Sequence, residues 1–82
     1  MNKYSRLKRF LELHREEKVT LTLEQIEMII DGELPPSARK YHAWWRGPSF
    51  HSHVKSWSDI GWSVEVHSEK GSIAWVVFKR NE

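Results

Sequence analysis

The chain has 82 residues, with 13 Lys or Arg, 11 Asp or Glu and no cysteine. The length predicts one domain, spanning residues 1–82. The lack of cysteine excludes disulfides, thiolate zinc sites and cysteine nucleophiles, and it fits a reducing compartment. The N-terminal segment has no apolar run typical of a secretory signal, and no segment approaches the ~20 apolar residues of a membrane span. We therefore expect a soluble, cytoplasmic protein.

Charge is distributed in blocks along the chain. Residues 1–18 carry six Lys or Arg against three Glu, and residues 19–34 carry four acids and no base. Residues 35–58 carry four bases and no acid. The two positive blocks are either ordinary solvated faces or a surface for an anionic partner such as nucleic acid. The charge pattern alone leaves both interpretations open.

A helix and a short strand are predicted before residue 22. Helical spacing predicts an amphipathic helix over about residues 3–16, with a stripe of Tyr4, Leu7, Phe10, Leu11 and His14. Basic residues occupy much of the remaining surface of this helix. Residues 18–21 are β-branched and alternating, which predicts a small strand.

A second helix is predicted over about residues 23–31. Thr22 and Gln25 have the spacing of a capping box, in which each side chain bonds the other residue's backbone amide. Gly32 is placed to end this helix. The segment 34–37 then reads as a turn, because it contains two prolines.

A third helix is predicted over residues 36–46, because proline is tolerated in a first turn and Gly47-Pro48 stops the pattern. Its stripe places Trp45 in the core. The adjacent Trp44 points about 100° away, so we expect it to be partly exposed, or to pack under the hairpin or against the next helix. An exposed Trp44 in a basic region would be able to stack on a nucleobase.

The C-terminal part predicts a short helix and a β-hairpin. Residues 50–60 form the expected fourth helix, with Gly61 as its C-terminal cap. Residues 62–67 alternate strictly, which predicts a strand with one buried face, and residues 73–78 predict its partner. Residues 68–71 are the expected turn. Three further tryptophans are assigned to the core: Trp57, Trp62 and Trp75.

This order of elements predicts an α+β fold with three to four helices, a short strand and a C-terminal hairpin. It is the order of a winged helix-turn-helix, in which the helix after the turn enters the major groove of DNA. In this chain that helix is 36–46, and the turn at 68–71 is the wing.

Three stretches of the chain also resemble a known family. They read TLTxExIExII, LPxSARKYxAWW and HSxxKxWxxxGWxV, and they extend from Thr20 to Val64. The pattern resembles a family of small bacterial and phage-borne domains. The resemblance implies a bacterial or mobile-element origin and assigns no activity. Arg46-Gly47-Pro48 stands where many relatives have asparagine or another polar residue, so no role of that loop is carried over.

The basic block supplies the candidate contacts to nucleic acid. Arg39 or Lys40 is expected to reach a guanine edge, and the other basic side chains are expected to contact phosphates. Phosphate contacts of this kind make binding depend on salt. Seven residues are assigned to the site: Arg39, Lys40, Trp44, Arg46, His53, Lys55 and Lys70.

Metal, cofactor and catalytic sites are not predicted. Histidine-only zinc sites need three well-placed ligands, and His51 and His53 do not face one way on a helix. His42 is expected to be a hydrogen-bonded core residue. There is no Ser/His/Asp order, phosphate-binding glycine loop or HExxH motif, so we expect no enzymatic activity.

Two functional hypotheses follow. The first is a DNA-binding domain, from a small bacterial or phage regulator or an accessory DNA reader, that docks residues 36–46 in the major groove of duplex DNA. The alternative is a protein-interaction module of a phage or plasmid protein that binds a host protein, because Trp and Arg are typical interface anchors. Salt dependence distinguishes them, since phosphate binding weakens steeply with salt. The sequence does not indicate an oligomeric state.

Overall fold

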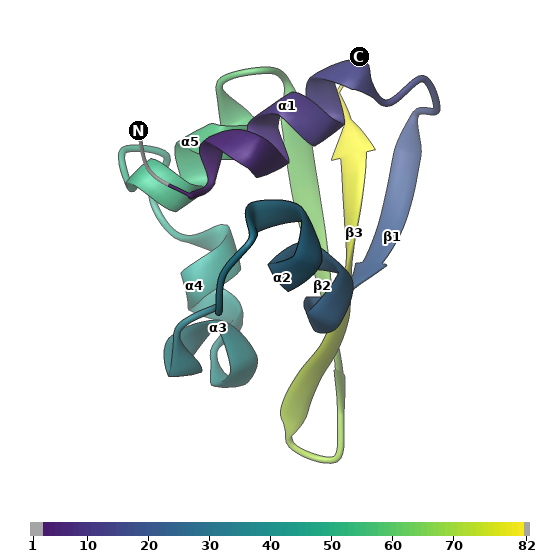
Figure 1. Cartoon of the computed structure of the whole chain (residues 1–82). Helices are drawn as coiled ribbons and strands as arrows, with labels where there is room; N and C mark the ends of the chain where they lie inside the picture. Colours follow the sequence, from purple (N-terminus) through teal and green to yellow (C-terminus); the bar gives the residue numbers. More distant parts are fainter. Residues whose placement is uncertain (1–2, 82) are drawn as a thin grey trace.

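Five helices and a three-stranded antiparallel sheet make up residues 3–81, the part of the chain that the computed structural model describes. In chain order they are α1 (Ser5–Leu13), β1 (Lys18–Thr22), α2 (Leu23–Ile30), α3 (Pro36–Lys40), α4 (His42–Arg46), α5 (Ser52–Ser58), β2 (Trp62–Glu69) and β3 (Ser72–Arg80). The strands lie in the order β1-β3-β2, and the helices lie on one side of the sheet (Figure 1). The predicted α+β class and C-terminal hairpin are confirmed.

The helix α1 is shorter than the predicted span of 3–16. It ends at Leu13 because the backbone of His14 is extended, with ψ of 127°, and the His14 amide bonds back to the Leu11 carbonyl. Leu7 and Leu11 are its buried side chains. The chain then reaches β1, which extends one residue beyond the predicted strand.

The start of α2 is the predicted capping box. The Gln25 amide donates to Thr22 Oγ1 at 3.1 Å, and the Thr22 amide donates to Gln25 Oε1 at 2.9 Å. The expectation for the other end is wrong: Asp31, with φ of 54°, adopts the left-handed conformation there, and Gly32 follows it. Aspartate is one of the few non-glycine residues that adopt this conformation readily.

The predicted continuous helix 36–46 is wrong. The chain breaks at Tyr41, which is extended with φ of −115° and ψ of 123°, so α3 and α4 are separate. Trp45 is fully buried, and its indole Nε1–H donates to the Ala38 carbonyl at 2.8 Å. In a continuous helix that carbonyl would accept from the amide of residue 42. The break therefore accompanies the burial of an indole whose N–H needs a partner.

The C-terminal elements differ from the prediction mainly at their ends. The helix α5 is shorter than the predicted 50–60, and Asp59 is its C-terminal cap in place of Gly61. Gly61, with φ of +82°, lies in the connection to β2. The hairpin turn consists of Lys70 and Gly71, with φ of 51° and 81°. Positive φ at both central residues is typical of a type I′ turn, whose twist matches a β-hairpin.

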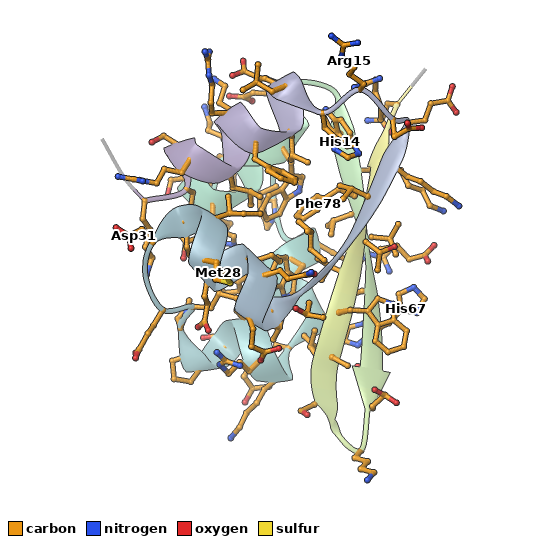
Figure 2. The ribbon with its side chains drawn as sticks, turned by 45° about the vertical axis from the view of Figure 1, so that its right-hand side comes forward. His14, Arg15, Met28, Asp31, His67 and Phe78 are labelled. Carbon is orange, nitrogen blue, oxygen red and sulfur yellow. The ribbon has the colours of Figure 1, made fainter. Side chains whose placement is uncertain are left out.

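The core lies between the helices and the inner face of the sheet. Trp45, Trp57 and Trp62 are buried in it, as predicted, and the Trp57 ring lies 5.3 Å from that of Phe78. Figure 2 shows Phe78 pointing toward the helices and His67 pointing away from them. The prediction for Trp75 is wrong: it is only half-buried, because alternation along β3 turns it away from the inner side chains Val76 and Phe78.

Candidate nucleic-acid interface

The region predicted to contact DNA is built from α3, the start of α4 and the β2–β3 turn. These segments lie toward the same end of the molecule, the lower end of Figure 1. His42, the first residue of α4, is exposed, so its assignment to the core is wrong. Its Nε2 is hydrogen-bonded to Ser68 Oγ, near the end of β2, at 2.7 Å. This bond ties α4 to the hairpin.

Two lysines of this region are free of ion pairs within residues 3–81. Lys40 is the last residue of α3 and is exposed. Lys70 is exposed at the tip of the hairpin. Tyr41 lies directly after Lys40, and 60% of its surface is exposed. The α3 end and the hairpin turn thus present two cations and a phenol to solvent.

Arg39 is engaged by the acidic helix α2. Its guanidinium donates to Glu27 Oε2 at 2.6 Å and lies 3.9 Å from Glu24. Glu27 also accepts the Leu34 amide at 2.8 Å, and this bond, together with Arg39, lowers the pKa of the Glu27 carboxyl. The carboxylate is therefore ionised at neutral pH and holds Arg39 toward α2.

Lys55 lies apart from Lys40 and Lys70, and Arg46 lies at the other end of α4 from His42. Arg46 is exposed at the end of α4. Lys55 is exposed on α5 and lines a small hollow between α1 and α5, with Lys8 and Asp59 among its other lining residues. Figure 1 shows α5 near the opposite end of the molecule from the hairpin turn. A single ligand surface at α3 and the hairpin turn therefore does not include Lys55.

Trp44 and His53 form an internal stack. Their rings are 3.9 Å apart and tilted by 10°, and His53 Nε2–H donates to the Trp44 carbonyl at 2.6 Å. Trp44 thus packs against the next helix, which is one of the arrangements expected from the sequence. Burial lowers the pKa of His53, so its ring is neutral at pH 7. One face of the Trp44 ring is covered, which leaves less of it for a nucleobase.

Comparison with protein families gives one match. The family is described as Domain of unknown function (DUF7662), and its model matches residues 4–77. The chain belongs to this family. The match extends from the start of α1 into β3 and includes all the residues assigned to the nucleic-acid site. No significant match is found among curated proteins or among solved structures.

Neither a metal-binding group nor a membrane-spanning helix is found in the described part of this DUF7662 domain. Residues 3–81 contain no group of three or more His, Cys, Asp or Glu side chains that would be able to hold a metal ion. None of the helices in the same range combines the length and apolar character needed to cross a bilayer.

Sequence reasoning missed a second set of polar and aromatic residues, on the outer face of the DUF7662 sheet. Lys18, Lys79 and His67 point away from the helices there, together with Trp75. The alternation of Trp75, Val77 and Lys79 along β3 is a signal that would have found this face. Trp75 was predicted to be buried because large aromatic side chains usually lie in the core.

Proposed function

We propose that this domain binds duplex DNA through the end of α3, the start of α4 and the β2–β3 turn, in a winged-helix arrangement. Supporting this are the order of the elements and the sheet order β1-β3-β2, with α2 and α3 as the helix-turn-helix pair and the hairpin as the wing. The role is that of a small regulator or accessory DNA reader, with binding and not catalysis as its activity.

The observation that carries the proposal is that two exposed lysines, Lys40 and Lys70, lie toward the same end of the molecule. They come from distant parts of the sequence, lie on segments at one end of the molecule, and have no ion-pair partner within residues 3–81. Each contacts a backbone phosphate in the proposed complex. Because α3 has only five residues, the groove receives α3 together with Tyr41 and His42, in place of one long helix.

The other assigned residues take different roles in this proposal. Arg39 holds α3 against α2 through Glu27, and Trp44 and His53 support α4 from inside. Arg46 adds a further phosphate contact beyond the start of α4. Lys55 contributes only long-range attraction, because it lies on α5.

The proposal is tested with labelled duplex DNA, by anisotropy at several salt concentrations. Lys40→Gln and Lys70→Asn should each weaken binding and reduce the log–log salt slope by about 0.9, the value for one phosphate contact. Asparagine at 70 removes the charge and still accepts positive φ, so the turn is kept. Lys18→Gln, on the outer face of the sheet, is the matched control and should leave duplex binding unchanged. Unaltered slopes in both test variants would reject the proposal.

A protein partner is the second candidate, favoured by exposed aromatic side chains. Phe50 is 73% exposed in the loop before α5 and stacks on His51 at 4.8 Å. Tyr41 is also largely exposed. Large aromatic side chains of this kind are common interface anchors. Salt-insensitive binding to a protein, lost in Phe50→Ala and kept in Lys40→Gln, would support this candidate over DNA.

A further inference from the structure

The face of the sheet that points away from the helices has an ordered arrangement of side chains. Strand register and alternation place three rows of residues across β1, β3 and β2 on this face. The first row is Lys18, Lys79 and Ser63, the second is Thr20, Val77 and Glu65, and the third is Thr22, Trp75 and His67. Figure 2 shows His67 projecting into solvent on this side, with no helix over it.

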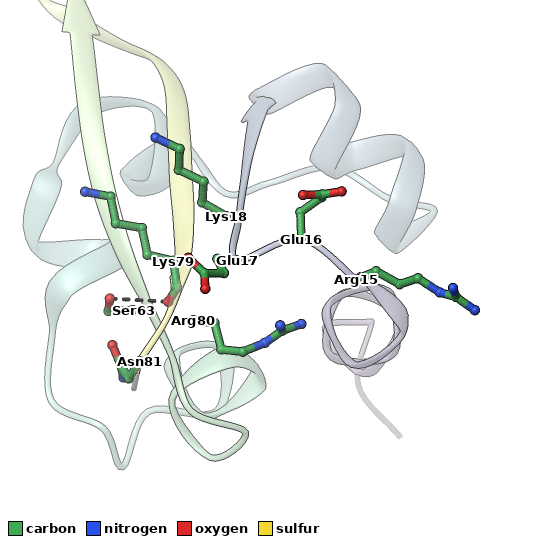
Figure 3. A pocket seen from close by; sticks show the side chains of 8 residues that line it. All are labelled: Arg15, Glu16, Glu17, Lys18, Ser63, Lys79, Arg80 and Asn81. Atoms are coloured by element: carbon green, nitrogen blue, oxygen red, sulfur yellow. Dashed lines mark hydrogen bonds between the residues drawn. The ribbon is translucent and has the colours of Figure 1, made fainter.

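The first of these rows consists of Lys18, Lys79 and Ser63, and it forms the cationic end of the face. Lys18 and Lys79 are directly opposite each other, and like charges in that position destabilise a sheet. Lys18 has no ion-pair partner within residues 3–81. Figure 3 shows the two lysine side chains extending in the same direction beside an open hollow, which Arg15 and Arg80 also line. Glu16 and Glu17 lie in the same lining and offset part of this charge.

The third row forms the aromatic end of the face. The His67 ring stacks on the Trp75 indole, with centroids 5.1 Å apart and planes 11° from parallel. His67 Nε2–H donates to Glu65 Oε2 at 2.6 Å, and Lys79 Nζ donates to Glu65 Oε1 at 3.2 Å. These bonds lower the pKa of the Glu65 carboxyl, His67 being the larger cause. A chain of contacts therefore fixes the stacked rings relative to Lys79.

We infer that this outer face binds single-stranded nucleic acid, with a base stacked on the Trp75–His67 pair and a backbone phosphate held by Lys18, while Lys79 stays paired with Glu65. Aromatic platforms beside cations are how proteins bind single strands without reading their sequence. Lys18 lies opposite Lys79, which is four residues from Trp75 on β3, roughly 13 Å. The occupant is therefore an oligonucleotide and not a mononucleotide. Val77 is the only aliphatic side chain in the three rows, and it is nearly buried, which leaves little apolar area for a protein partner.

The test is anisotropy of a labelled oligo(dT) strand with the full chain at several salt concentrations. Lys18→Gln should reduce the log–log salt slope by about 0.7, the single-strand value for one phosphate. Trp75→Thr should weaken binding by about 10-fold, as expected for the loss of one stacked base. Arg6→Gln, on the exposed side of α1, removes one charge that belongs to neither proposed surface. It is the matched control and should leave oligo(dT) binding unchanged.

A second measurement keeps the inference falsifiable if Trp75→Thr does not fold. Amide NMR shifts of the unaltered chain, followed during the oligo(dT) titration, should change along β1, β2 and β3 and not at α3. No binding at low salt, equal weakening by Lys18→Gln and Arg6→Gln, or equally tight binding of poly-glutamate would overturn the inference. The duplex proposal is judged separately, because its variants are Lys40→Gln and Lys70→Asn. Oligo(dT) binding that depends on Lys18 stands even if duplex binding fails.

Discussion

At the residue scale, a basic side chain that already has an ion-pair partner is less available to contact a ligand. Arg39 and Lys40 are neighbours on α3, but Glu27 binds Arg39 at 2.6 Å, whereas Lys40 has no ion pair within residues 3–81. Both are predicted from the sequence to contact DNA, because both lie in the basic block 35–58, which contains no acid. The acid that separates their roles lies on α2, and only the packing of α2 against α3 brings it to Arg39.

Arg39→Ala should therefore act on stability more than on DNA binding. The variant loses an ion pair that is partly exposed, so we expect the free energy of unfolding to fall by about 1 kcal/mol or less. The measurements are urea unfolding and duplex anisotropy, with Lys40→Gln as the comparison. A loss of duplex affinity in Arg39→Ala as large as that in Lys40→Gln, with unchanged stability, would show that the guanidinium contacts DNA.

His53 gives the fold a dependence on pH. Burial lowers its pKa in the folded protein below the ordinary value of 6.5. The unfolded chain thus takes up a proton first, so stability is complete above pH 6.5 and falls as the pH drops toward the folded pKa. The pKa of Glu27 and of Glu65 is also lowered, and these carboxyls add to the pH dependence of stability only near and below their ordinary value of 4.5.

We expect urea midpoints of the unaltered chain to fall between pH 7 and pH 5, and to fall less in His53→Gln. Glutamine can still donate to the Trp44 carbonyl but does not titrate. Unfolding curves at several pH values for both chains make the comparison. Equal pH dependence in the two would place the titrating group elsewhere.

At the element scale, the break between α3 and α4 depends on one side-chain hydrogen bond. Trp45 is buried and its indole occupies the Ala38 carbonyl. Trp45→Phe removes that donor and some core volume, so the free energy of unfolding should fall by about 2–4 kcal/mol. Trp57→Phe is the control, because Trp57 is equally buried and its indole makes no hydrogen bond within residues 3–81. Urea unfolding should show a larger loss for Trp45→Phe, and equal losses would argue against the role of this bond.

Most helices and strands were predicted from the sequence, because the interactions that form them join residues a few positions apart. The capping box of Thr22 and Gln25 and the alternation along β2 each involve residues a few positions apart. The break at Tyr41 was not predicted, because the helical spacing of Ala38 and Trp45 continues across it. Only the folded core shows that the indole of Trp45 turns back onto Ala38.

The site was less predictable than the fold, because its residues meet only through tertiary structure. Lys40 and Lys70 were named from the sequence, but the bond between His42 and Ser68 that joins their segments spans 26 positions. Alternation alone does not show which face of β3 is buried, because both faces carry apolar side chains. The register with β1 and β2 and the packing of the helices decide which face is buried.

At the scale of the whole molecule, the charge blocks partly neutralise one another. The acidic block at α2 meets Arg39, whose guanidinium lies beside both Glu27 and Glu24. Among the cations with no ion pair within residues 3–81, Lys40 and Lys70 lie toward the hairpin end and Lys18 lies on the outer face of the sheet. The small net charge of +2 conceals this separation.

The two surfaces are separate, so their variants should act independently. Lys40 belongs to a helix on the inner side of the sheet, and Lys18 points from the outer side. Substitutions at distant sites that share no partner usually have additive effects. The duplex and single-strand proposals therefore stand or fall separately.

The central claim, that this domain binds duplex DNA, is tested most directly by titrating labelled duplex DNA with the unaltered chain at several salt concentrations. With at least Lys40 and Lys70 on phosphates, binding should weaken steeply with salt, with a log–log slope of about −1.8 or steeper. The double variant Lys40→Gln/Lys70→Asn should lose that part of the slope. No binding at low salt, or binding whose slope is the same in the double variant, would contradict the account.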